Sequence, residues 1–173
     1  MLQHYSVKCL EKSYDGIFCL QLRDKKENES FYLCVCYLPP ENSSRGGHGE
    51  DFFDMLLSGV SKYKDCGKIQ ICGDFNARTG KLPDIIEGID SIRQRKTIDY
   101  ETNSQGRSFI DFCVFSNLCC LAGRYTNDNF TCVSHKGRSV VDDCIVPYYD
   151  LNLYSNFDVL LIAELIDKYL FQY

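Results

Sequence analysis

The residues best suited to chemistry lie in one hexapeptide, Gly73-Asp74-Phe75-Asn76-Ala77-Arg78. It follows the run Lys68 to Cys72, which is predicted to be a short strand, and Gly73 is expected to let the backbone turn at the strand's end. In an extended stretch Asp74 and Asn76 point the same way, while Phe75 points back into a core. A carboxylate can orient and deprotonate a water molecule, and an amide can hold that water or a phosphoryl oxygen. The alternative is an ordinary polar turn, because glycine, aspartate and asparagine all favour turns.

A second acidic segment contains Asp142, within the run Val140 to Val146 that is predicted to be a strand. Asp142 shares one face of that strand with Val140, Cys144 and Val146. Burying an unpaired charge is costly, so a carboxylate among apolar neighbours normally has a partner or a task. An edge strand with solvated acids accounts for the pattern equally well.

A third candidate is Tyr37, which stands at the end of a predicted strand and just before Pro39-Pro40. Its phenol could donate a hydrogen bond to a phosphate, although packing in a core is the more common role of such a residue.

Strands and helices alternate along the chain and position these residues. We predict strands at Ile17–Leu22, Phe31–Leu38, Lys68–Cys72, Phe130–Ser134, Val140–Val146 and Phe157–Leu161, and helices at 51–64, Phe109–Leu118 and Ile162–Leu170. The strand Phe31–Leu38 is apolar on both alternating faces, which predicts cover on both sides. A long polar connection runs from Ala77 to Gln105. The alternation indicates an α/β or layered α+β sandwich, formed by residues 1–173 as a single domain.

Composition and the cysteines restrict the class of protein. Hydrophobic residues make up 45% and charged residues 25% of the chain, which is typical of a globular protein. No segment approaches the roughly 20 apolar residues of a membrane span, and the start does not have the pattern of a signal peptide. Several of the eleven cysteines lie inside apolar runs. We therefore expect them to be reduced, and the protein to be intracellular, in the nucleus or the cytoplasm.

The net charge of −5 gives no overall attraction to nucleic acid. If the substrate is DNA, recognition must depend on a local basic surface. The candidates are Arg78, Arg93, Arg95, Lys96, Arg107, Arg124, Lys136 and Arg138. Solvated loop charges are the alternative interpretation.

The order of several motifs resembles one family. The motifs are Tyr37-Leu38-Pro39-Pro40-Glu41-Asn42, then Gly73-Asp74-Phe75-Asn76-Ala77-Arg78, then Gly123-Arg124 and Phe130-Thr131-Cys132, and finally Ser139-Val140-Val141-Asp142. Together they resemble the endonuclease/exonuclease/phosphatase superfamily. The resemblance is closest to the endonuclease domains of non-long-terminal-repeat retrotransposons, which are related to deoxyribonuclease I, and it runs from about Asp15 to Phe157.

The resemblance implies a four-layer sandwich of the deoxyribonuclease-I type and hydrolysis of DNA phosphodiesters with Mg²⁺ or Mn²⁺. It implies that Asp74 activates the attacking water, that Asn76 helps to position it and that Tyr37 contacts the phosphate. The aspartate that matches Asp142 orients a histidine in such enzymes. The candidates for substrate binding are Arg78, Arg124 and Ser139.

The sequence also departs from the family pattern. Two N-terminal strands with an asparagine and a metal-holding glutamate, and a C-terminal Ser-Asp-His element, have no counterpart here. Asp143 and Ala122 stand where tyrosine and asparagine are usual. We therefore expect an incomplete domain, truncated at both ends, whose endonuclease activity is impaired. Two alternatives are a superfamily phosphatase or phosphodiesterase and a non-catalytic remnant of a mobile element.

Overall fold

The computed structural model describes residues 4–44, 49–125, 130–135 and 137–159. Its helices are α1 (Gly49–Tyr63) and α2 (Ser104–Ser116), followed late in the chain by the 3₁₀ helix η2 (Tyr148–Leu153). Its strands are β1 (Tyr5–Tyr14), β2 (Ile17–Asp24), β3 (Ser30–Tyr37), β4 (Lys68–Asp74), β5 (Leu118–Cys120), β6 (Cys132–Ser134), β7 (Gly137–Ser139) and β8 (Asp142–Pro147).

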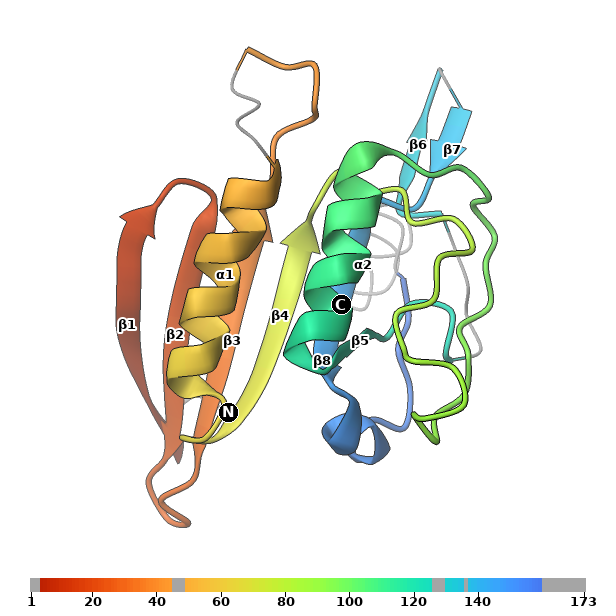
Figure 1. The fold of residues 1–173 in the computed structure, drawn as a ribbon. Coiled ribbons are helices and arrows are strands. Elements are labelled where there is room, and N and C mark those ends of the chain that lie inside the picture. The colour runs from red at the N-terminus through yellow and green to blue at the C-terminus, as the bar shows by residue number, and fades with distance from the viewer. Residues whose placement is uncertain (1–3, 45–48, 126–129, 136, 160–173) are drawn as a thin grey trace, which may run out of the picture.

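Six strands form one mixed sheet in the order β1-β2-β3-β4-β8-β5, and β6 and β7 form a separate hairpin. Among the described strands only β3 and β4 pair in parallel, and α1 makes the crossover between them. Figure 1 shows α1 and α2 side by side across one face of the sheet. The α/β fold is therefore confirmed, and the described residues form one helical layer and one large sheet.

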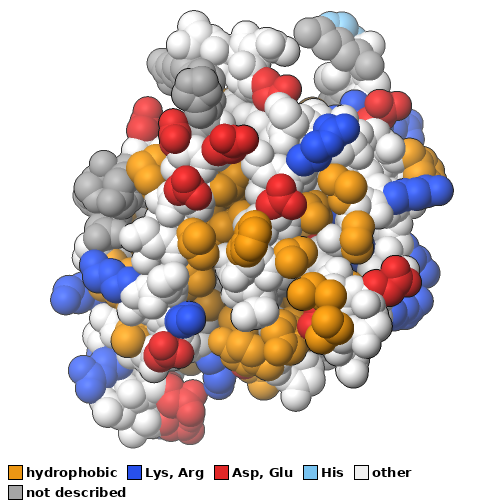
Figure 2. All heavy atoms as spheres, in the orientation of Figure 1, with side chains coloured by type: hydrophobic (Ala, Val, Ile, Leu, Met, Phe, Trp, Pro, Cys, Tyr) orange, Lys and Arg blue, Asp and Glu red, His pale blue; other side chains and the backbone are white. Residues whose placement is uncertain are grey.

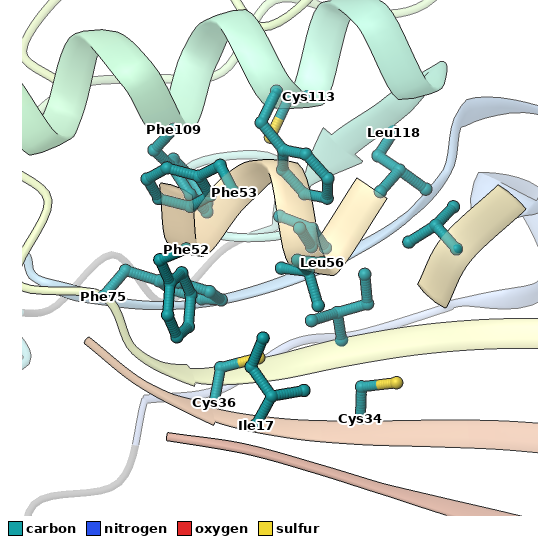
Figure 3. Packing of buried hydrophobic residues seen from close by; sticks show 14 of the residues in the cluster. Ile17, Cys34, Cys36, Phe52, Phe53, Leu56, Phe75, Phe109, Cys113 and Leu118 are labelled. Carbon is teal, nitrogen blue, oxygen red and sulfur yellow. The ribbon is translucent and has the colours of Figure 1, made fainter. Parts of the chain in front are cut away.

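The helix α1 confirms the helical period expected for residues 51–64 and supplies much of the core. Phe52, Phe53, Leu56 and Val60 are buried on its inner face. Phe75, which follows β4, and Phe109 on α2 have ring centroids 4.7 Å apart. Figure 3 shows both rings near Phe53 of α1. This aromatic cluster joins both helices to β4, the strand that carries the hexapeptide.

The helix α2 begins five residues earlier than predicted. The side chain of Asn103 caps it by accepting a hydrogen bond from the amide of Gly106 at 2.8 Å. Asn117 ends it in the left-handed conformation with φ 56°, so Leu118 begins β5 rather than ending the helix. The strand β1 was not predicted, although Tyr5, Val7 and Cys9 alternate with Ser6 and Lys8 along it. The predicted helix Ile162–Leu170 lies outside the described residues, as does the end of the predicted strand Phe157–Leu161.

The prediction that β3 is covered on both faces is wrong for the described part of the chain. Tyr32, Cys34 and Cys36 are buried beneath α1, as expected of an inward face. On the other face Val35 is 42% and Tyr37 51% exposed. The apolar pattern therefore marks one buried face and one open face of this strand.

The prediction that every cysteine is reduced is wrong at one pair. Cys19 and Cys34 stand opposite each other on β2 and β3 and form a disulfide with a Cα–Cα distance of 4.1 Å. The other nine cysteines are free thiols. None of the helices in the described ranges is long and apolar enough to cross a bilayer.

Side chains of different kinds are unevenly distributed on the face that carries the helices. Figure 2 shows acidic side chains toward the upper part of this face and hydrophobic ones gathered in its middle and lower parts. Exposed hydrophobic residues at the lower end belong to α2 and η2, among them Phe115, Tyr149 and Leu153. That end lies opposite the end of β4 that carries Asp74 (Figure 1).

Candidate active site

Three of the predicted site residues form a row across the sheet. Tyr37 on β3 is the register partner of Asp74 on β4, and Asp74 is the partner of Asp142 on β8. Because paired residues on neighbouring strands project from the same face, these side chains lie side by side. The sheet thus brings together Asp74 and Asp142 from segments 68 residues apart, which is the difference of their numbers.

Gly73 has a different role from the one expected. It lies within β4 and not at a turn after it. A Cβ atom there would stand 1.9 Å from the carbonyl oxygen of Cys36 on β3. Only glycine allows the two strands to approach this closely beside Asp74.

Asn76 and Asp74 are not related by simple strand alternation, because Asn76 takes a left-handed conformation with φ 46°. Its backbone amide donates a hydrogen bond to Oδ1 of Asp74 at 2.9 Å. Its side-chain Nδ2 donates to the carbonyl of Leu38 at 2.8 Å. This local turn resembles those that asparagine and aspartate side chains commonly make. The prediction that Phe75 points into the core is confirmed, since that side chain is fully buried.

Asp74 and Asp142 open onto a hollow with a volume of about 390 Å³. Its wall is made by Cys72, Gly73, Asp74, Thr131, Asp142, Asp143, Cys144, Phe157, Asp158 and Val159. The hydroxyl of Thr131 accepts hydrogen bonds from the amides of Val141 and Asp142 at 3.0 and 3.1 Å. Thr131 therefore holds the start of β8, a role that its place in the predicted strand Phe130–Ser134 did not reveal.

Burial raises the pKa of Asp74, and the nearby charge of Asp142 raises it further. The hydrogen bond from the amide of Asn76 opposes both effects. Mg²⁺ and Mn²⁺ prefer hard oxygen ligands such as carboxylates. The pair of Asp74 and Asp142 fits such an ion, because a cation between the two carboxylates would relieve their repulsion. Among the described residues no third histidine, cysteine, aspartate or glutamate completes a cluster around a metal.

Arg78 is held beside this site by Asp99. Its Nε and Nη2 donate to the two carboxylate oxygens of Asp99 at 2.9 and 2.6 Å. Asp99 also accepts a hydrogen bond from the amide of Val140 at 3.0 Å, two residues before Asp142. The side chain of Arg78 remains 33% exposed, which leaves it partly open to a substrate.

Arg124 is placed differently from the prediction that it binds substrate. Its guanidinium is buried and donates to both carboxylate oxygens of Asp84. An ion pair sealed from solvent cannot contact DNA, so this expectation is corrected. Asp84 also lies 3.7 Å from Nε of Arg95, so these arginines stabilise the loops instead.

Ser139 lies apart from the carboxylate pair. It ends β7 in the small hairpin, and its carbonyl accepts a hydrogen bond from the amide of Thr131 at 3.1 Å. It does not belong to the wall of the hollow. Its contact to Thr131 is structural, and direct substrate binding by its hydroxyl remains a prediction.

Three polar residues of the connection between β4 and α2 were not predicted from the sequence to have a role, namely Asp84, Asp99 and Asn103. Each accepts hydrogen bonds from groups distant in sequence. The sequence around Asp84 and Asp99 has no pattern that indicates these roles. Asn103 carried a signal, because an asparagine before Ser104-Gln105 is a typical start of a helix.

No protein-family model and no curated protein matches this sequence. Solved structures do match. A 3′-5′ exonuclease, NExo from Neisseria meningitidis, has a TM-score of 0.56 and 12% identity, over 87% of this chain and 61% of that one. A structure of the 3′ phosphatase NExo from Neisseria bound to product DNA hairpin has a TM-score of 0.51 and 12% identity, over 82% of this chain and 57% of that one. An endonuclease/exonuclease/phosphatase family protein from Leptotrichia buccalis matches with a TM-score of 0.41 and 11% identity, over 75% and 41% of the two chains.

The chain thus spans about three fifths of the length of the NExo structures. Sequence identity at this level carries no information on activity, whereas the matching arrangement of strands and helices does establish the architecture. The described part of the chain has the deoxyribonuclease-I-like α/β fold found in the Neisseria exonuclease NExo.

Proposed function

We propose that this chain is a Mg²⁺-dependent DNA endonuclease domain of the retrotransposon type, which hydrolyses phosphodiester bonds. The observation that carries the proposal is the pairing of Asp74 with Asp142 beside a hollow at one end of the sheet. Ligand sites in open α/β sheets favour such strand ends. Tyr37 beside Asp74 and Asn76 just after it add groups that can hydrogen-bond to a phosphate.

Each of these groups has a chemical task in such a reaction. Asp74 would orient the attacking water and accept its proton, and burial favours the second step by raising the pKa of this carboxyl. The phenol of Tyr37 would donate to a non-bridging oxygen of the phosphate. A Mg²⁺ or Mn²⁺ ion held by Asp74 and Asp142 would supply a positive charge that stabilises the charge developing on the phosphate.

DNA is the proposed substrate. The structurally similar NExo is a 3′-5′ exonuclease and a 3′ phosphatase, and one of its structures holds a DNA hairpin product. Among the described members of the predicted basic set, Arg93, Lys96, Arg107 and Arg138 are exposed. With the partly exposed Arg78 they supply positive charge to a protein of net charge −5.

A second candidate is removal of a 3′-phosphate from DNA. The likeness to NExo supports it, because that protein is a 3′ phosphatase in its complex with product DNA. The same carboxylate pair would serve both reactions, since both transfer a phosphoryl group to water. Only the position of the phosphate in the DNA differs.

The test compares nicking of a supercoiled plasmid with release of phosphate from a DNA hairpin that carries a 3′-phosphate. Both reactions are run with Mg²⁺, with Mn²⁺ and with EDTA. Because no third metal-binding side chain is present among the described residues, we expect slow nicking that needs a high concentration of Mg²⁺. Asp74→Asn should lower the rate by about 10²-fold or more.

The matched control is Asp111→Asn, which makes the same change at an exposed position on α2. It should leave the rate unchanged. Phosphate release without nicking would favour the second candidate over the first. Absence of both reactions, or nicking that Asp74→Asn does not reduce, would overturn the proposal of catalysis at this site.

A further inference from the structure

The side chain of Asn103 is bound to the segment that follows Asp74. Its Nδ2 donates to the carbonyl of Asn76 at 2.8 Å, and its Oδ1 accepts from the amide of Arg78 at 2.9 Å. The backbone amide of Asn103 donates to the carbonyl of Arg78 at 3.1 Å. Three hydrogen bonds therefore join this residue to a segment about 25 positions away, in addition to its cap on α2.

Gly106 brings the first turn of α2 against the same segment. A Cβ atom at this position would stand 1.9 Å from the carbonyl oxygen of Arg78. Residues with a side chain do not fit there without moving the backbone of Arg78. Figure 1 shows this end of α2 beside the end of β4 from which the segment leaves.

Gln105 ties the same turn to the loop that follows Tyr37. It is buried, and its Nε2 donates to the carbonyl of Pro39 at 2.7 Å. Its backbone amide donates to Oε1 of Glu41 at 2.8 Å. The start of α2 thus contacts both the loop that follows Tyr37 and the segment that follows Asp74.

Asn76 has φ 46°, in the left-handed region that asparagine adopts more readily than most residues with a side chain but still at some energetic cost. The hydrogen bond from Asn103 to its carbonyl helps to offset that cost. In this conformation the amide of Asn76 reaches Oδ1 of Asp74. A chain of two hydrogen bonds therefore runs from the start of α2 to the carboxylate.

We propose that Asn103 is a positioning residue, whose side-chain amide fixes Asn76 and through it the carboxylate of Asp74. The geometry alone supports the role of Asn103 in orienting Asp74. The effect of that role on the catalytic rate rests on the proposed function. Asn103 also caps α2, so the two roles must be separated by experiment.

Asn103→Ser separates them. Serine is as good a helix cap as asparagine, it is uncharged, and it has no amide that reaches Asn76. The control is Asn117→Ala, which weakens the other end of α2 because alanine is strained at φ 56°. Asn117→Ala therefore lowers the stability of the helix without touching the site, whereas Asn103→Ser keeps a helix cap and removes the hydrogen bond to Asn76.

Two readouts need no enzymatic activity. Amide hydrogen exchange by NMR should be about tenfold faster at Asn76 in Asn103→Ser, the amount expected for one lost hydrogen bond. The titration of the Asp74 carboxyl group, followed by the chemical shift of its carboxyl carbon, should move to higher pH. The reason is that the backbone amide of Asn76 no longer stabilises the charged form. Asn117→Ala should change neither. Unchanged exchange and titration in folded Asn103→Ser would overturn the proposal.

If Asn103→Ser does not fold, Asn103→Asp serves instead. Aspartate can keep both contacts of Oδ1, but it replaces the donor to Asn76 by a charged oxygen that repels the Asn76 carbonyl. The exchange rate of the Asn76 backbone amide then decides. In the plasmid assay, Asn103→Ser should lower kcat and leave KM unchanged, since DNA contacts are preserved. If the native chain shows no nicking, the proposed function fails, while exchange and titration still decide the role of Asn103.

Discussion

Arg124 and Asp84 form a buried two-point ion pair, with Nη1 2.7 Å from Oδ2 and Nη2 2.9 Å from Oδ1. Asp84 also accepts a hydrogen bond from the amide of Cys120 at 2.7 Å. Burial by itself would raise the pKa of Asp84, but the hydrogen bonds and charge of Arg124 outweigh it and lower the pKa. The pair therefore fixes the irregular connection after β4 against the start of the loop after β5.

Removing Arg124 should destabilise the fold strongly. Arg124→Ala leaves the buried Asp84 carboxylate with only the amide of Cys120 and the more distant Arg95 as partners, which should cost about 3–5 kcal/mol in the free energy of unfolding. The measurement is urea unfolding followed by circular dichroism. Arg93→Ala, at an exposed arginine, should change it by less than about 0.5 kcal/mol. Equal small effects of both substitutions would contradict the structural role of Arg124.

Asp143 should make the protein less stable as the pH rises. Burial raises its pKa to about 6, above the ordinary value of 3.8. Between these values the folded state binds more protons than the unfolded state, so the free energy of unfolding falls as the pH increases through this range.

Asp143→Asn should remove this decrease in the free energy of unfolding with rising pH. Its oxygen can still accept from the amides of Ala122 and Cys144, as Oδ1 of Asp143 does now. At pH 8 we expect the variant to be about 1–3 kcal/mol more stable than the native chain, with a much smaller difference at pH 4. Unfolding at the two pH values checks this, with Asp111→Asn as the exposed control. A native chain that gains stability above pH 6 would refute the prediction.

Divalent ions should stabilise the native chain through the carboxylate pair. At ten times the dissociation constant, bound Mg²⁺ should add about 1.4 kcal/mol to the free energy of unfolding. Thermal melts with MgCl₂, MnCl₂ and NaCl at equal ionic strength measure the effect. Asp74→Asn and Asp142→Asn should each abolish it, while Asp111→Asn should retain it. The same Tm increase in all three variants would place the ion elsewhere.

The disulfide between Cys19 and Cys34 should be detectable by alkylation. Denatured protein without reductant should show nine modified cysteines, and eleven after reduction. Replacing both residues by alanine should cost about 3 kcal/mol, as expected for a cross-link that closes a loop of this length, with a sequence separation of 15. Eleven modified cysteines without reductant would show that the pair is reduced.

Features set by local periodicity could be predicted from the sequence. The helical spacing of Phe52, Leu56 and Val60 predicted α1, and the apolar runs at β3, β4 and β8 predicted those strands. The hexapeptide ending in Arg78 and the distant Asp142 were identified as one site, and the sheet register does place Asp74 beside Asp142. Such patterns are readable because each residue's preference repeats along a single element.

Features that depend on partners distant in the chain were decided only by the tertiary structure. Arg124 looked like a surface residue for DNA until the fold placed Asp84 against it. Cys19 and Cys34 become neighbours only through the register of β2 with β3. The conformation of Asn76, and with it the orientation of Asp74, depends on Asn103 at the start of α2. The sequence by itself thus determined which side chains could do chemistry. The tertiary structure determined which of them are buried, paired and held in place, because hydrogen bonds and ion pairs form between groups that are close in space and often distant in sequence.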